Sequence, residues 1–163
     1  MASRSRIGSL VVDLVYLGLS PLLFLVLLVI SRGFTRPKIR RGIAEKLGRA
    51  LPRRDGAQPS IWVHAVSVGE VLTALPLIDA LRRRHDPLDL RVSVSTFTGL
   101  EVARQNLPGT HVFYFPLDLS IVVRRFFDRL RPTAVVLLEL ELWPNFLLEA
   151  RRRGVPVLVA NGR

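Results

Sequence analysis

The sequence predicts an α/β protein: a Rossmann-like parallel sheet preceded by an N-terminal membrane-anchor helix. From residue 61 onward, short runs rich in apolar and β-branched residues alternate with segments that repeat apolar residues at helical spacing. Five such runs with four helical segments between them are typical of a doubly wound parallel sheet. An uncharged stretch and then a strongly basic one come before them.

The N-terminal residues have the composition of a membrane anchor. Residues 14–30 carry no charge and, as a helix, would span about 25 Å, slightly less than the ~30 Å hydrocarbon core of a bilayer. A cleaved signal peptide is the alternative, but no small-x-small cleavage pattern follows Ile30. We therefore expect residues 1–31 to form a single anchor that spans the bilayer or lies partly in one leaflet.

Residues 32–60 form a basic segment and linker in which Glu45 and Asp55 are the only acids. Basic residues directly after an apolar helix mark the cytoplasmic side of a membrane, and they attract anionic lipids. A solvated basic linker is the alternative. Nucleic acid is not an expected partner, because the charges are not interleaved with a series of aromatic side chains. The net charge of +11 over the whole chain also favours an anionic partner.

The first half of the α/β region is expected to hold two strands and two helices. The apolar run 61–66 predicts a strand, and apolar residues at helical spacing predict a helix over 69–84, with Pro76 as a kink. A second run, 90–96, is rich in β-branched residues and predicts another strand. Thr98 and Gly99 then begin a short helix that ends near Asn106.

The second half repeats the alternation and adds three strands. A strand over 111–115 precedes the clearest amphipathic helix of the chain, 119–130. The run 133–138 is apolar on both faces, as buried parallel strands are. A helix over 144–153, with proline in its first turn and glycine after its end, leads to the last predicted strand, 155–160.

Candidate functional residues lie where these strands end, because ligands of open α/β sheets bind at the carboxyl ends of the strands. The polar and small residues at these positions are Ser67, Gly69, Glu70, Thr96, Thr98, Gly99, Asp118, Glu139, Glu141 and Asn145. Glu139 and Glu141 directly extend a buried strand, and in extended geometry they would face the same side.

Several of these residues also have a structural interpretation. Glu70 in a first helical turn complements the helix dipole, and Thr96 and Thr98 are common turn formers. Ser67 does not lie in a Gly-x-Ser-x-Gly elbow, and the first loop lacks the Gly-x-Gly-x-x-Gly pattern of dinucleotide sites. The chain has no cysteine and its three histidines are scattered, so we expect neither thiolate chemistry nor a metal site, and no cofactor is implied.

Five motifs, in this order, resemble the N-terminal half of bacterial Kdo transferase, the 3-deoxy-D-manno-octulosonic acid transferase of lipid A biosynthesis. They are His64-Ala-Val-Ser-Val-Gly-Glu70, Thr96-Phe-Thr-Gly99, Phe115-Pro-Leu-Asp118, Glu139-Leu-Glu-Leu-Trp-Pro-Asn145 and Asn161-Gly-Arg163. The resemblance covers essentially the whole chain. It implies the two-domain GT-B glycosyltransferase fold, with residues 61–163 as the acceptor-binding domain and the C-terminal donor domain absent.

The resemblance also implies a reaction and a location. The family transfers Kdo from CMP-Kdo to the 6′-hydroxyl of a lipid A precursor, with inversion, at the cytoplasmic face of the inner membrane. Glu70 would be the general base, and Glu139 would stabilise the transition state, with Glu141 as the neighbouring candidate. Ser67, Gly69, Thr96, Thr98, Gly99, Glu141 and Asn145 would contact substrate.

Two positions depart from the family pattern, since Leu140 replaces the usual threonine and Gly162 the usual alanine. Because the family holds CMP-Kdo mainly in its C-terminal domain, we expect this chain alone to be inactive. The alternative function is a non-catalytic, membrane-bound fragment or module that binds lipid without transferring a sugar.

Overall fold

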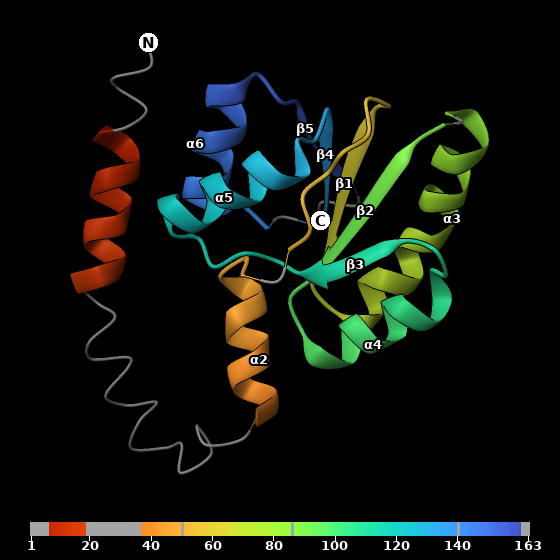
Figure 1. The fold of residues 1–163 in the computed structure, drawn as a ribbon, viewed down its shortest axis with the longest axis horizontal. Helices are drawn as coiled ribbons and strands as arrows, with labels where there is room; N and C mark the ends of the chain where they lie inside the picture. The colour runs from red at the N-terminus through yellow and green to blue at the C-terminus, as the bar shows by residue number, and fades with distance from the viewer. Residues whose placement is uncertain (1–6, 19–36, 50, 86, 140, 161–163) are drawn as a thin grey trace.

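The computed structural model describes residues 7–18, 37–49, 51–85, 87–139 and 141–160. Figure 1 shows a single sheet with helices on both faces. The strands are β1 (Ser60–Ala65), β2 (Asp89–Val94), β3 (His111–Tyr114), β4 (Ala134–Leu138) and β5 (Val157–Ala160). The labelled helices are α2 (Pro37–Lys46), α3 (Val68–Arg84), α4 (Phe97–Asn106), α5 (Ser120–Leu130) and α6 (Pro144–Arg153). One further helix occupies residues 7–18.

All pairings in the sheet are parallel, and the strand order is β3-β2-β1-β4-β5. The chain therefore runs outward from β1 to β3, returns to the other side of β1 as β4, and continues outward to β5. The order reverses between β1 and β4, where His64 pairs with Leu137. This topology confirms the predicted Rossmann-like sheet and defines its switch point.

Two hydrophobic layers cover the sheet, one on each face. Val63 and Ala65 of β1 belong to the layer beneath α3 and α4, whereas Trp62 belongs to the layer beneath α5 and α6. Figure 1 shows the two helix pairs on opposite sides of the strands. Because neighbouring residues of a strand point to opposite faces, a strand buried on both faces is expected to be apolar on both. The run 61–66 fits this expectation apart from His64, which is also buried.

Trp62 is fully buried at the centre of the second layer. Five phenylalanine rings lie with centroids 5.0–6.2 Å from its indole ring: Phe113, Phe115, Phe126, Phe127 and Phe146. Its indole N–H donates to Ser93 Oγ at 2.7 Å, so its one polar atom is satisfied. Rings from β3, from the residue just after it and from two helices therefore meet on one side chain.

The basic segment contains helix α2, which the sequence prediction did not include. Two arginines of α5 fix the chain just after this helix: Arg125 Nη1 donates to the carbonyl oxygen of Leu47 at 2.7 Å, and Arg129 Nη1 donates to that of Gly48 at 2.9 Å. Carbonyls at a helix end lack intrahelical partners, and arginine supplies them here. Leu51 then enters the core. The predicted division of the chain at residues 31 and 60 stays a prediction.

The helix at residues 7–18 covers only the first part of the predicted anchor, and residues 19–30 lie outside the described residues. Among the residues that the structure describes, no helix is both long enough and apolar enough to cross a membrane. The helix docks beside α5 and α6 through Asp13, whose carboxylate oxygen Oδ1 accepts from Asn145 Nδ2 at 2.9 Å.

The two tryptophans of the chain provide a matched test of the core. We expect Trp62→Phe to lower the free energy of unfolding by about 2 kcal/mol, because it leaves a cavity and removes the hydrogen bond to Ser93. Trp143→Phe should cost less than about 1 kcal/mol, since Trp143 is exposed. Urea unfolding of both variants measures the difference, and equal losses would contradict the central position of Trp62.

Candidate functional site

The candidate site lies at the switch point, where the loops after β1 and β4 begin side by side. Because His64 pairs with Leu137, the residues just after these strands, Val66 and Glu139, leave the sheet next to each other. The crevice outside the carboxyl ends at a switch point is where open α/β sheets bind ligands. Glu70 and Glu139 therefore come from the two loops that flank this switch point.

Ser67 and Glu70 form a capping box at the start of α3. Ser67 is the N-cap residue, and its Oγ accepts from the backbone N–H of Glu70 at 3.5 Å. The Glu70 carboxylate reaches back, so that Oε2 accepts from the backbone N–H of Val66 at 2.7 Å and Oε1 accepts from Ser67 Oγ at 3.0 Å. These hydrogen bonds hold the carboxylate in one orientation. Each oxygen has a second lone pair, so a further donor can still be accepted.

Thr96 caps the next helix, α4, in the same way. Its Oγ1 accepts from the backbone N–H of Gly99 at 3.1 Å, and its own N–H donates to the carbonyl oxygen of Val66 at 3.2 Å. The second bond ties the loop after β2 to the loop that carries Glu70. Thr98 lies exposed in the first turn of α4.

The two glycines of these loops differ in why a glycine is present. A Cβ atom at Gly99 would lie 2.6 Å from Val94 Cγ1 and 2.8 Å from Thr96 Oγ1, so close packing at the start of α4 requires glycine there. At Gly69 the nearest atom, Ser67 Oγ, would be 4.0 Å away, and the residue is exposed. Internal packing therefore does not require glycine at position 69.

The structure corrects the predicted geometry of the two glutamates after β4. The strand ends at Leu138, and Glu139 has a φ of 67°, in the left-handed region that side chains other than glycine seldom adopt. Glu139 and Glu141 are therefore not successive outward positions of an extended strand. The backbone N–H of Glu139 still donates to the carbonyl oxygen of Ala160 at 2.9 Å, which fixes the turn against β5.

The side chains in this loop have different surroundings. Glu139 is exposed, whereas the Glu141 carboxylate accepts from Trp143 Nε1 at 2.7 Å. A non-glycine residue held in left-handed backbone costs on the order of 1–3 kcal/mol, and such strain clusters at functional sites. Of the two, Glu139 is therefore the stronger candidate for contact with a ligand.

Asp118 caps α6, the helix that follows the glutamate loop. Its Oδ2 accepts from the backbone N–H of Asn145 at 3.0 Å, and its Oδ1 accepts from that of Phe146 at 2.8 Å. Trp143, at the N-cap position, provides no side-chain bond of its own. Burial raises the pKa of Asp118 above its usual value, and the two amides oppose this shift.

The Asn145 side chain joins Asp118 to the N-terminal helix. Its Nδ2 donates to the backbone carbonyl oxygen of Asp118 at 2.6 Å and to Asp13 Oδ1 at 2.9 Å, and the residue is buried. Asp13 in turn caps α5, because its carboxylate accepts from both the backbone N–H and the hydroxyl of Ser120. Sequence reasoning missed these contacts, and the role of Asn145 in substrate binding stays a prediction.

His64, at the end of β1, is fully buried and stacks on Phe115 with ring centroids 3.9 Å apart. Its Nδ1 lies 3.0 Å from Ser93 Oγ and 3.1 Å from the Ser93 carbonyl oxygen. Burial lowers the pKa of His64 to about 4, so the ring is neutral at physiological pH. Within the described ranges, no three histidine, aspartate or glutamate side chains are placed to hold a metal ion.

Together these features define a Rossmann-like α/β domain whose switch point is lined by glutamate and hydroxyl side chains. Residues 41–163 match the family model described as 3-deoxy-D-manno-octulosonic-acid transferase (Kdo transferase). The chain belongs to the Kdo transferase family, which confirms the resemblance seen in the five motifs.

Curated relatives carry the same name. The 3-deoxy-D-manno-octulosonic acid transferase of Chlamydia pneumoniae is 37% identical over 128 residues, covering 77% of this chain and 29% of the relative. That of Haemophilus influenzae is 34% identical over 129 residues, covering 78% of this chain and 30% of the relative. A protein named a probable mitochondrial 3-deoxy-D-manno-octulosonic acid transferase, from Arabidopsis thaliana, is 34% identical over 104 residues, covering 63% of this chain and 23% of the relative. The matched segment thus spans under a third of each.

The contrast between the glycines predicts opposite effects on stability. Gly99→Ala should lower the free energy of unfolding by about 1–3 kcal/mol, because the added methyl group collides with Val94 and Thr96. Gly69→Ala should leave it unchanged or raise it by up to about 1 kcal/mol, as alanine favours helix. Urea midpoints of the two variants measure this contrast. A destabilised Gly69→Ala variant would contradict the open space beside that residue.

The buried His64 predicts a pH dependence of stability. The unfolded chain takes up the proton near pH 6.5 and the folded chain only near pH 4, so falling pH favours unfolding between these values. We expect His64 to account for a loss of about 3 kcal/mol across this window. Urea unfolding at a series of pH values should give a shallower slope for His64→Gln. Parallel curves for the two proteins would contradict the assignment.

Proposed function

We propose that this chain is the acceptor-binding part of an inverting Kdo transferase, which moves Kdo from CMP-Kdo to the 6′-hydroxyl of a lipid A precursor. The family membership and the names of the relatives support the reaction class. The observation that carries the proposal is the Glu70 carboxylate, which is held in a fixed orientation at the switch point by Val66 and Ser67.

Glu70 is proposed to act as the general base. A base must come within about 3 Å of the hydroxyl whose proton it removes, and the free lone pairs of Glu70 provide acceptors for that hydroxyl. The open space beside Gly69 allows a substrate to approach the carboxylate closely. As the acceptor oxygen bonds to the anomeric carbon, its proton passes to Glu70 and CMP departs.

Glu139 is proposed to stabilise the transition state. Glycosyl transfer develops positive charge at the anomeric centre, and a carboxylate fixed nearby stabilises that charge. The left-handed backbone of Glu139 and its exposed side chain support this role. The proposed substrate contacts remain those of the family motifs: Ser67, Gly69, Thr96, Thr98, Gly99, Glu141 and Asn145.

The donor and the membrane complete the proposal. CMP-Kdo is proposed to bind mainly outside the matched segment, which makes up 29% and 30% of two of the relatives. The protein is proposed to be held at the cytoplasmic face of the inner membrane by a single anchor within residues 1–31. The uncharged stretch and the basic segment 32–60 support this location, with anionic lipids as the partner.

A non-catalytic, lipid-binding module is the second candidate function. The capping box favours it, because Glu70 already has a complete structural role at the start of α3. The two functions make opposite predictions for a variant that preserves the cap but removes the base.

Glu70→Gln provides that test, because glutamine also completes a capping box but does not take up a proton. In the protein that joins this chain to a donor-binding domain, we expect Kdo transfer to lipid IVA to fall by about 10²–10⁴-fold. The urea midpoint should stay unchanged. Glu101→Gln, on the exposed face of α4, is the matched control and should keep full activity. Full transferase activity in the Glu70→Gln variant would show that Glu70 is not the general base, and it would favour the second function.

A further inference from the structure

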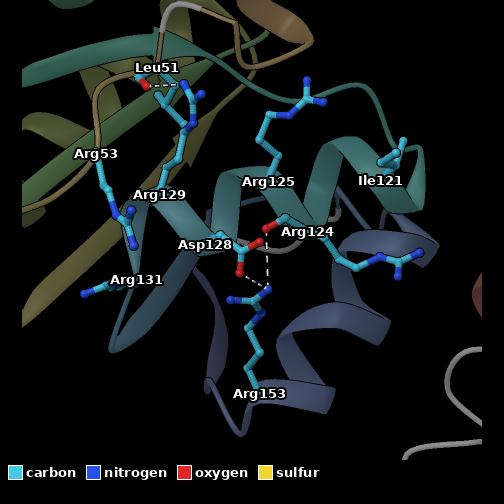
Figure 2. A pocket seen from close by; sticks show the side chains of 9 residues that line it. All are labelled: Leu51, Arg53, Ile121, Arg124, Arg125, Asp128, Arg129, Arg131 and Arg153. Atoms are coloured by element: carbon cyan, nitrogen blue, oxygen red, sulfur yellow. Dashed lines mark hydrogen bonds and ion pairs between the residues drawn. The ribbon is translucent and has the colours of Figure 1, made fainter.

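An open groove with a volume of about 940 Å³ runs along α5 and is not lined by Glu70, Glu139 or Glu141. Figure 2 shows the side chains that line it, from Ile121 at one end to Arg131 at the other. Six of the nine lining residues are arginines: Arg53, Arg124, Arg125, Arg129, Arg131 and Arg153. Asp128 is the one acid among the nine, so the groove carries a strong excess of positive charge.

The arginines of this arginine groove differ in how they are bound. Arg125 and Arg129 donate to carbonyl oxygens of the segment after α2, and Arg153 forms an ion pair with Asp128 at 2.7 Å. By contrast, no hydrogen bond or ion pair of the Arg53 or Arg131 side chain is found within the described ranges. Two guanidinium groups are therefore available for an anion, beside others whose positions are fixed by the fold.

The surface next to the groove is apolar. Helix 7–18 turns Asp13 toward the protein and leaves large apolar side chains 53–61% exposed: Ile7, Leu10, Val11, Leu14, Val15 and Leu17. This helix is attached at Ser120, and the adjacent residue Ile121 is 65% exposed at the end of the groove. An outward apolar helix face beside a row of arginines matches the two layers of a membrane surface, acyl chains and phosphates.

We propose that the arginine groove binds the phosphate groups of anionic membrane phospholipids while the apolar face of helix 7–18 lies against the acyl chains. Guanidinium groups bind phosphate with paired, charge-assisted hydrogen bonds. Nucleic acid is disfavoured because no aromatic side chain lines the groove. The proposal rests on the membrane location proposed above. It adds a lipid site made mostly of arginines outside the basic segment 32–60.

Lipid cross-linking in vesicles tests the site directly. The 163-residue chain is reconstituted into phosphatidylcholine vesicles that contain a photoactivatable phosphatidylglycerol with its reactive group near the phosphate. Mapping of the cross-linked peptides should place lipid on α5. Arg53→Gln with Arg131→Gln should reduce this cross-linking by about fivefold for each arginine removed, because each cation near the surface adds a similar attraction.

The matched control removes the same charge from the other face of the sheet. Arg83→Gln with Arg84→Gln, at the exposed end of α3, should leave cross-linking to α5 unchanged. Three results would contradict the proposed lipid site: equal labelling of α5 by a photoactivatable phosphatidylcholine, an equal loss of cross-linking in the Arg83→Gln, Arg84→Gln control, or no label on α5. If the chain does not associate with vesicles, the membrane location fails as well, so the two failures are distinguishable.

Discussion

The structure depends on the need to satisfy the N-terminal amides of four helices that begin at one edge of the sheet. Each helix leaves its first N–H groups without intrahelical partners, and burial makes such groups costly. A side chain caps each of the four helices by accepting from one or two of these amides: Ser67 for α3, Thr96 for α4, Asp13 for α5 and Asp118 for α6. The loops at the switch point are thus ordered before any ligand binds.

This constraint explains why the candidate site and the supporting structure share residues. Glu70 completes the cap of α3 and is the proposed base, and the cap is what holds its carboxylate in one orientation. Asp118 caps α6, the helix that follows the loop of Glu139. It therefore helps to position that loop, and no substrate contact is proposed for it. The four helix N-termini also point their positive dipole ends toward the edge where an anionic sugar nucleotide is proposed to react.

Most of the fold was predictable from local pattern, and the exceptions have physical reasons. The five strands and α3 to α6 follow from periodicity and from turn residues, and their ends agree to within about two residues. Helix α2 was not predicted, because the basic composition of residues 32–60 indicated a linker. The end of this helix is held by tertiary contacts with Arg125 and Arg129. The extended geometry expected for Glu139 and Glu141 was wrong because β4 ends at Leu138 and the next residue, Glu139, has a left-handed backbone.

The elements, the order of the motifs and the two local caps are encoded locally, because Ser67–Glu70 and Thr96–Gly99 act within one helical turn. Which strands are neighbours, and therefore which loops flank the switch point, depends on the packing of the whole domain. The same packing forms the distant caps, since Asp13 and Asp118 reach helices through contacts that no local pattern encodes. The arginine groove arises likewise, because Arg53, Arg131 and Arg153 come together only when α5, α6 and the linker pack.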